Sequence, residues 1–368
     1  MEEKLYCTRC ECLIENDDYD TVHDEIICDR CCDDYTVLCE CCSERIWLDE
    51  DCGDNSIYLC ESCRDNNYSY CYNCERLIHN EDSYEYDNES YCYSCYEELD
   101  KFRGIHPYSY KPCPKFFGKY DKGNSTRFFG VELEVDKGGQ EDDNARKILD
   151  YANYDAEHIY IKNDGSLNDG FEIVSHPATL DYHLNEFPWE DILHNAIQMG
   201  YRSHQTSTCG LHIHVNRLSL GETHYDQEDV ISRVLYLVEA YWNELLKFSR
   251  RTESAMNRWA SRYGYESTPK KLMDKAKSTY GRYVAVNLCP RDTIEFRLFR
   301  GTLKRNTLHA TIQLVNHICE TALFLCDDEI QSLAWSDFVA DIKDPELIRY
   351  LKERRLYINE ETDTEEEI

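Results

Sequence analysis

Residues 128–135 read FFGVELEV, a stretch in which apolar and acidic side chains alternate. Alternation with a period of two predicts a β-strand with one apolar face and one polar face. Val131 and Leu133 would then face a core, while Glu132 and Glu134 would share the opposite face. The stretch therefore predicts a half-buried strand that carries two carboxylates on one side.

Three more segments show the same alternation: residues 171–174 (FEIV), 211–216 (LHIHVN) and 293–300 (TIEFRLFR). The first of them follows the turn at residues 163–166, which reads NDGS. Any ordinary half-exposed antiparallel strand alternates in this way, so one segment alone is weak evidence for a site. A merely solvated face tends to carry Lys, Thr, Ser and Glu. The polar faces of these three segments instead carry Glu172, His212, His214, Asn216, Glu295 and Arg297.

Several carboxylates on one sheet face repel one another unless cations neutralise them. A ligand set that is mainly oxygen, with one or two histidines, suits Mg²⁺ or Mn²⁺ better than Zn²⁺, and such ions usually bridge a protein to phosphates. Arg297 and Arg300 could clamp a phosphoryl group through charge-assisted hydrogen bonds, and Arg282 precedes a further strand predicted at residues 283–288. No phosphate-binding glycine loop occurs, so a nucleotide would have to bind on the sheet face.

The segments between the strands have the apolar spacing of helices and predict an α+β fold. The predicted helices cover residues 141–156, 180–199, 227–250, 306–326 and 344–355.

The cysteines of residues 1–100 form Cys-x-x-Cys pairs that recur with a period of 32 residues. The twelve periodic positions are Cys7, Cys10, Cys28, Cys31, Cys39, Cys42, Cys60, Cys63, Cys71, Cys74, Cys92 and Cys95. Two such pairs offer the four thiolates of a structural zinc site, which predicts about three Zn²⁺ ions in an array of zinc-ribbon or LIM-like knuckles. Three sequential sites are the simplest arrangement, and ligation that interleaves the repeats remains open.

A disulfide framework is the structural alternative, and the absence of a secretory signal argues against it. Cys12, Cys32, Cys41 and Cys52 break the period, and we interpret them as spare thiols rather than a fourth site.

Charge is distributed unevenly along the 368 residues, whose formal net charge is −32. Residues 1–100 hold 29 acidic and 6 basic side chains. So much negative charge disfavours nucleic acid as a partner. No apolar run is long enough to span a membrane, and we expect a cytoplasmic protein. The composition predicts a zinc-binding module (1–100), a linker rich in Pro and Gly (101–126), a catalytic domain (127–356) and an acidic disordered tail (357–368).

The four strand motifs, in this order, resemble the amidoligase family of carboxylate-amine ligases, which has a glutamine-synthetase-like fold. The resemblance covers about residues 127–330 and excludes the cysteine array. It implies a curved antiparallel sheet with helices on one side, and a concave face that binds ATP and two or more Mg²⁺ ions.

The resemblance also implies roles for particular residues. Glu132, His212 and Glu295 would hold one metal ion, and Glu134 and Glu172 would hold another. His214 and Arg297 would face the ATP phosphates, with Asn216 and Arg282 as further candidates for nucleotide contacts. Synthetases of that fold supply two glutamates where only Glu172 is matched, and Asp164 is the possible replacement.

The implied reaction is ATP-dependent formation of an amide through an acyl phosphate. Arg297 and Arg300 would stabilise the transferring phosphoryl group, and Asp164 could accept the proton of the amine. The acidic zinc module would recruit a protein or peptide substrate; an amino acid or another small amine is also possible, as is a homo-oligomer. A phosphotransferase of the same superfold and a non-catalytic zinc-binding adaptor are the alternatives, and Cys209 near His212 is a less favoured candidate nucleophile.

Overall fold

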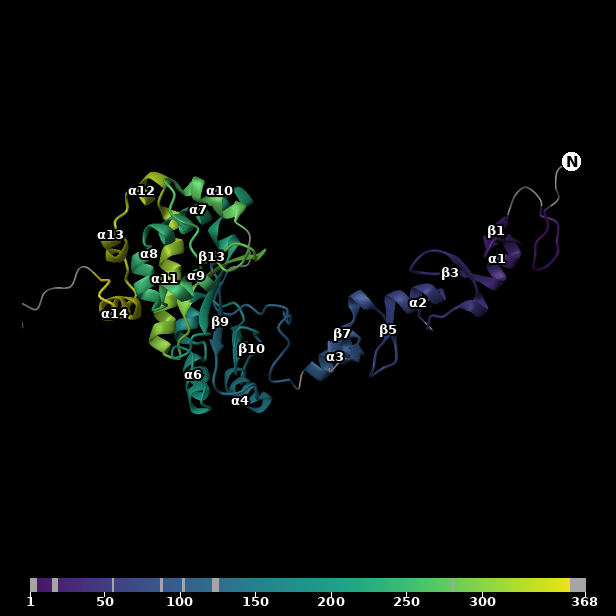
Figure 1. Ribbon diagram of the computed structural model, residues 1–368, viewed down its shortest axis with the longest axis horizontal. Coiled ribbons are helices and arrows are strands. Elements are labelled where there is room, and N and C mark those ends of the chain that lie inside the picture. Colours follow the sequence, from purple (N-terminus) through teal and green to yellow (C-terminus); the bar gives the residue numbers. More distant parts are fainter. Residues whose placement is uncertain are drawn as a thin grey trace, which may run out of the picture. The chain divides into compact units, whose positions relative to one another are not determined.

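The computed structural model of the chain describes residues 5–14, 19–54, 56–86, 89–100, 103–120, 126–279 and 281–357. The chain divides into two compact units, Met1–Phe102 and Arg103–Ile368 (Figure 1). The predicted acidic tail lies outside the described residues except for Tyr357.

The first unit consists of short two-stranded hairpins, each followed or preceded by a helix of two turns. Its strands are β1 (Tyr19–Val22), β2 (Glu25–Cys28), β3 (Thr36–Leu38), β4 (Arg45–Trp47), β5 (Tyr68–Tyr70), β6 (Leu77–His79), β7 (Tyr84–Tyr86) and β8 (Glu89–Tyr91). Its helices are α1 (Asp29–Tyr35), α2 (Glu61–Asn67) and α3 (Tyr93–Asp100), with 3₁₀ turns at Leu48–Glu50 and Asn80–Asp82. The hairpins pair as β1-β2, β3-β4, β5-β6 and β7-β8.

The first cysteine pair of each repeat lies in a tight turn of constant geometry. Glu11, Ser43 and Glu75, each four residues after the first cysteine of its repeat, have φ angles of 60°, 63° and 57°. The backbone N–H of each donates to the carbonyl of that cysteine, as from Ser43 to Cys39 at 2.8 Å. The residue with positive φ bends the chain so that the two thiols of one turn point the same way. Because this geometry recurs in all three repeats, the sequence period of 32 is a structural period as well.

Each repeat has a hydrophobic cluster of its own, made largely of cysteines and one or two larger side chains. Ile27 and Leu59 are fully buried, and Tyr91 takes the equivalent position in the third repeat. Such clusters are too small to stabilise domains of this length by hydrophobic burial alone.

The second unit is an α+β domain around a six-stranded sheet of order β10-β11-β9-β12-β14-β13, in which every neighbouring pair is antiparallel. The strands are β9 (Phe129–Val135), β10 (Ile159–Lys162), β11 (Phe171–Ser175), β12 (Gly210–Asn216), β13 (Val286–Asn287) and β14 (Thr293–Arg300). The predicted fold class is confirmed.

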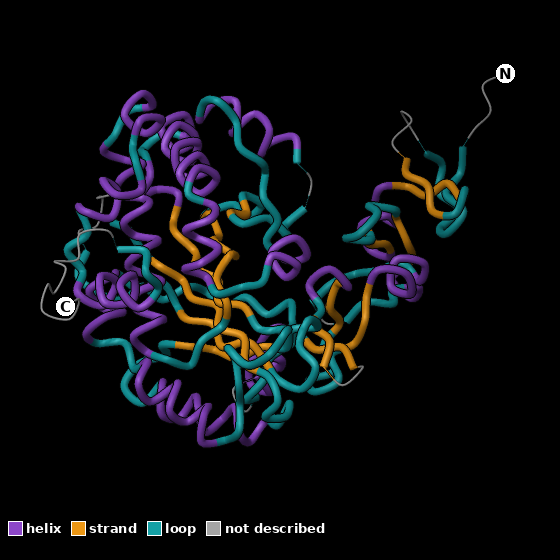
Figure 2. Tube along the Cα trace, turned by 60° about the vertical axis from the view of Figure 1, so that its left-hand side comes forward, coloured by secondary structure: helices purple, strands orange, loops and turns teal. Residues whose placement is uncertain are grey.

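The helices of this unit pack mainly against one side of the strands (Figure 2). They are α4 (Asp142–Ala152), α5 (Leu180–Asn185), α6 (Trp189–Gln198), α7 (His224–Ala240), α8 (Trp242–Ser249), α9 (Glu253–Trp259), α10 (Pro269–Ser278), α11 (Arg305–Phe324), α12 (Asp327–Ser332), α13 (Trp335–Ala340) and α14 (Pro345–Glu353), with a 3₁₀ turn at Arg217–Leu220. Among the described residues, none of these helices combines the length and the apolar character needed to cross a bilayer.

Two predicted helices are each divided in two. The segment predicted as 180–199 breaks before Pro188, which cannot continue a helix because it lacks an N–H donor. The segment predicted as 227–250 is interrupted at Tyr241, between α7 and α8.

The apolar face of the sheet forms the core. Leu133, Ile213 and Phe296, from three neighbouring strands, are fully buried together with residues of α4, α6, α7 and α11. The opposite face is polar, because β-strand side chains alternate.

β14 departs from regular alternation at one point. Leu211 pairs with Phe299 but Ile213 pairs with Phe296, so β14 carries one extra residue there, which is a β-bulge. As a result Leu298 and Phe299 are both buried.

Part of the predicted linker belongs to the second unit. The backbone N–H of His106 donates to Ile161 at 2.8 Å, and that of Phe117 donates to Pro177 at 3.0 Å. Residues 103–120 are therefore attached to the sheet domain, although they lack regular secondary structure.

Candidate functional site

The polar face of the sheet brings six of the predicted side chains together on four adjacent strands. Glu132 and Glu134 lie on β9, with Glu172 on β11, His212 and His214 on β12, and Glu295 on β14. The register places His212 opposite Glu132, Glu172 opposite Glu134, and His214 opposite Glu295. Cross-strand neighbours of this kind are close enough for direct contact.

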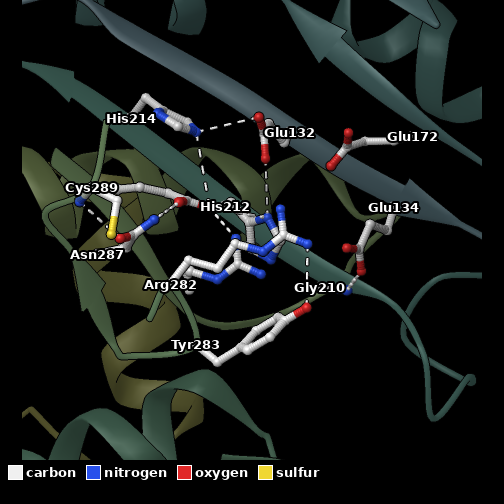
Figure 3. Close-up of polar contacts among 12 residues, drawn as sticks. Glu132, Glu134, Glu172, Gly210, His212, His214, Arg282, Tyr283, Asn287 and Cys289 are labelled. Atoms are coloured by element: carbon white, nitrogen blue, oxygen red, sulfur yellow. Dashed lines mark hydrogen bonds and ion pairs between the residues drawn. The ribbon is translucent and has the colours of Figure 1, made fainter. Parts of the chain in front are cut away.

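Glu132 is the centre of this group (Figure 3). Its Oε2 lies 3.2 Å from His212 Nδ1, and its Oε1 lies 3.4 Å from His214 Nε2. His212 Nδ1 is also 3.5 Å from Glu295 Oε1. Glu295 is held in turn by Asn287, whose Nδ2 donates to Oε2 at 2.7 Å, and by an ion pair with Arg297.

Burial and mutual repulsion act strongly on these carboxyl groups. Burial, and next the charge of Glu132, raise the pKa of Glu172 well above its usual range. Burial alone would also raise the pKa of Glu132, but the two histidines outweigh it and hold that pKa well below normal. Burial raises the pKa of Glu134. The sheet face thus holds more carboxyl groups than its two histidines can pair with.

The geometry fits a divalent cation. Ligand atoms of Glu132, His214 and Glu295 lie within 4.8 Å of one another, as do those of Glu132, Glu172 and His212. The buried Nε2 of His214 makes no hydrogen bond of good geometry, which is typical of a ligand atom whose partner is an ion. These residues could hold Mg²⁺ or Mn²⁺.

The grouping differs from the predicted one in one respect. His214, expected to face phosphates, joins Glu132 and Glu295 as a potential ligand. Glu134 accepts a hydrogen bond from the backbone N–H of Gly210.

Arg251 is a site residue that sequence reasoning missed. A Cβ atom at Gly210 would lie 2.4 Å from Arg251 Nη2 and 2.8 Å from His212 Nε2, so the missing side chain of Gly210 lets the guanidinium reach the sheet. Burial lowers the pKa of Arg251 to about 10, and Glu134 opposes that shift. Because Arg251 follows α8 in a loop, no local pattern marks it.

Lys162 is the second residue that was missed. It ends β10, an edge strand that was not predicted, and its Nζ lies 3.0 Å from Glu172 Oε2 and 4.0 Å from Glu132 Oε1. Burial would lower the pKa of Lys162, but these two carboxylates outweigh it and raise the pKa. The chain therefore supplies a fixed cation beside the second predicted metal position.

Replacing Lys162 with Gln should strengthen Mn²⁺ binding. Two unit charges 4 Å apart interact by about 4 kcal/mol at an effective dielectric constant of about 20, so removal of this competing cation should tighten binding by about tenfold or more. Titration of the zinc-loaded protein without nucleotide, followed by electron paramagnetic resonance of free Mn²⁺, measures the change. Lys147→Gln, on the exposed side of α4, removes the same charge elsewhere. Equal affinities in all three proteins would contradict this role of Lys162.

A cavity of about 390 Å³ opens in front of the carboxylates. Glu134, Asp164 and His212 contribute to its wall, and Arg282 and Arg297 bring positive charge. Three aromatic residues, Tyr108, Trp259 and Tyr283, also line it. Arg282 Nη2 donates to the Tyr283 hydroxyl at 3.2 Å, and its Nη1 donates to that of Tyr108.

Two predicted site residues, Asn216 and Arg300, and the candidate nucleophile Cys209 do not line this cavity. Asn216 accepts from the N–H of Phe128 at 2.8 Å and donates to the carbonyl of Thr126 at 3.0 Å, so its amide anchors the start of β9. Arg300 points into other cavities, because of the bulge in β14. Burial raises the pKa of Cys209 to about 12, which makes its thiol a poor nucleophile.

The first unit brings its twelve periodic cysteines into three sequential groups of four. These are Cys7, Cys10, Cys28 and Cys31; Cys39, Cys42, Cys60 and Cys63; and Cys71, Cys74, Cys92 and Cys95. All 21 cysteines are free thiols. Burial alone would raise the pKa of Cys7 and of Cys39, but backbone N–H groups outweigh it and hold both pKa values at about 6. Four such donors suit Zn²⁺, and the groups do not interleave.

Fold and site together define a protein of the α+β class whose open sheet face is suited to divalent cations, joined to a module of four-cysteine sites. A family model described as "Putative amidoligase enzyme" matches residues 133–319, just over half of the chain. The chain belongs to this family, which places it among the ligases and confirms the resemblance found in its strand motifs.

Solved structures show lower similarity. One is a "novel glutamine synthase homolog", with 15% identity and a TM-score of 0.33, over 62% of this chain and 64% of that one. Another is a bifunctional glutathione synthetase from Pasteurella multocida, with 14% identity and a TM-score of 0.35, over 62% of this chain and 46% of that one. No curated protein matches the chain.

Proposed function

We propose that the protein is an ATP-dependent ligase that joins a carboxylate to an amine through an acyl phosphate. The observation that carries this proposal is the convergence of Glu132, Glu172, His212, His214 and Glu295 on one sheet face. They form two groups of three that share Glu132, and the ligand atoms of each group lie within 4.8 Å of one another. Membership of the amidoligase family supports a ligase in general terms.

The chemistry follows from the charges around the cavity. Mg²⁺ or Mn²⁺, when bound, would neutralise the triphosphate and polarise its γ-phosphate. A carboxylate oxygen of the substrate attacks the γ-phosphorus, the bond to the β-phosphate oxygen breaks, and ADP leaves. The amine nitrogen then attacks the acyl carbon, and inorganic phosphate leaves.

Three groups of this chain would support these steps. Arg297, held by Glu295, faces the cavity and can stabilise charge on the transferring phosphoryl oxygens. Asp164 lies on the cavity wall near Glu134 and is available to take the proton released by the amine. Arg282, with Tyr108 and Tyr283, offers a cationic and aromatic edge for the nucleotide.

The zinc module would serve substrate recruitment. It exposes many tyrosines, among them Tyr70, Tyr72 and Tyr93, and tyrosine is enriched at protein–protein interfaces. Its acidic charge would suit a basic segment of the partner. A protein or peptide is therefore the substrate or partner that we favour.

Hydroxylamine tests the proposal directly, because it traps an acyl phosphate as a hydroxamate. We expect purified protein with Mg²⁺, ATP, hydroxylamine and a mixed pool of amino acids and peptides to release ADP and to form a hydroxamate, identified by mass spectrometry. ADP release with a stable phosphorylated product and no hydroxamate would instead identify a phosphotransferase. The Glu132→Gln protein provides the background for both signals.

A further inference from the structure

A second cavity, of about 510 Å³, lies beyond the end of the sheet and is lined mainly by cations. They come from α8 and the loop after it, from the end of β14 and from the end of α14. The charged or ionisable residues in its wall are His204, Lys247, Arg250, Arg251, Arg300 and Arg354. We name it the cationic cavity.

The five Lys and Arg side chains of the cationic cavity make no ion pair with a carboxylate in the part of the chain that the structure describes. Four of them donate to backbone carbonyls, as from Arg300 Nη1 to Arg250 at 3.3 Å and from Arg354 Nη2 to Lys247 at 2.8 Å, and Arg250 interacts with the hydroxyl of Tyr350. Lys247 and Arg251 likewise donate to Arg355 and Arg297 carbonyls. The chain has 72 acidic and 40 basic side chains, so most of its cations could find a carboxylate partner. A group of cations without such a partner is therefore suited to binding an external anion.

The pKa of His204, in the wall of the cavity, is consistent with an excess of positive charge around it. Burial lowers the pKa of His204 to about 4, and Arg250, Arg300, Lys304 and Arg354 lower it in the same direction. An anion in the cavity would relieve this repulsion.

The cationic cavity is connected to the sheet site through shared wall residues. An intermediate cavity of about 350 Å³ has Arg251 and Arg300 in common with the cationic cavity. It has Thr208, Arg251 and Trp259 in common with the cavity in front of the carboxylates. A ligand long enough to follow these residues could place one end at the sheet face and the other among the arginines.

We propose that the cationic cavity binds the carboxylates of an acidic segment, rich in glutamate or aspartate, of a peptide or protein whose reactive carboxylate lies at the sheet face. That this peptide is the substrate rests on the proposed ligase function. A nucleotide fits the cationic cavity less well, because the described residues of its wall include no Phe, Tyr or Trp on which a base could stack. The aromatic residues lie instead around the carboxylates of the sheet.

A fluorescein-labelled oligo-L-glutamate, followed by fluorescence anisotropy at low ionic strength without ATP, tests the site in the full chain. We expect Lys247→Glu with Arg250→Glu to weaken binding by about tenfold or more, since hydrogen bonds to charged groups are lost and repulsion replaces them. Lys147→Glu with Lys270→Glu makes the same change of net charge on exposed faces of α4 and α10, and should leave binding unchanged. ATP binding should be equal in all three proteins.

The milder pair Lys247→Gln and Arg250→Gln, with thermal melting as the folding control, separates loss of charge from loss of structure. Equal weakening in the cavity and control variants, or a loss of ATP binding confined to the cavity variant, would overturn the proposal. So would failure of the unaltered protein to bind the oligoglutamate. Because binding is measured without ATP, it can persist when no hydroxamate forms, and that result would contradict the ligase function alone.

Discussion

Glu132→Gln is expected to reduce ATP turnover by about 100-fold or more, since it removes one charge from the position on which the cation site is centred. Glu132 contacts His212 and His214, lies 4.0 Å from Lys162, and belongs to both of the ligand groups described above. The histidines hold its pKa well below normal, so it is ionised at neutral pH. Gln keeps the shape but supplies neither the charge nor a second acceptor oxygen.

The fold should survive this change. Glu132 is on the polar face, with its side chain 20% exposed, and its neighbour Glu172 gains from the loss of a like charge. Glu295→Gln is less informative, because it would also disturb Arg297 and Asn287. ADP release, Mn²⁺ titration and thermal melting should be compared with those of Glu186→Gln, an exposed residue after α5. Full turnover by the Glu132 variant would show that the cation site is assigned to the wrong residues.

Cys71→Ser is expected to remove one Zn²⁺ per chain and to unfold the third repeat. The hydrophobic cluster of that repeat contains Cys71, Cys92 and Cys95 themselves, with Ile78 and Tyr91 as the larger members. Zinc contributes about 10–16 kcal/mol to the folding of small zinc domains, far more than so few buried side chains can supply. Native mass spectrometry gives the metal count, and limited proteolysis locates the unfolded segment.

Cys52→Ser is the matched control, because Cys52 lies in the same unit but outside the three groups of four, and its thiol donates to the carbonyl of Glu50 at 3.4 Å. The main melting transition of the sheet domain should not move in either variant, since its core contains no residue of the first unit. If the zinc module recruits the substrate, removal of zinc should slow turnover on a protein or peptide while sparing a small carboxylate. A Cys71→Ser protein with its full metal content would contradict the grouping.

The strands that carry the site could be predicted because their information is local. Alternation marks β9, β11, β12 and β14 within a few residues each, and the apolar half of the pattern is buried as expected. The cysteine groups could be predicted for a similar reason, since one period fixes all twelve positions, although the choice of sequential over interleaved groups needed the structure.

The roles of Arg251 and Lys162 could not be predicted, because they depend on packing between segments that are distant in the sequence. Arg251 reaches the sheet over Gly210, some forty residues earlier in the chain, and neither residue is unusual in its own surroundings. Lys162 ends a strand of four residues whose polar side chains, Tyr160 and Lys162, do not suggest a metal site by themselves. Their roles follow only from the neighbours that the fold provides.

The bulge in β14 limits how this part of the gene can vary. In a regular strand, residues three positions apart face opposite sides, yet Arg297 and Arg300 both lie on the polar side and line different cavities. Substitutions near Leu298 and Phe299 can keep that arrangement, whereas insertion of one further codon between Arg297 and Arg300, with the bulge retained, would turn Arg300 toward the core side of the strand. Related chains should therefore differ in composition along this strand far more readily than in its length.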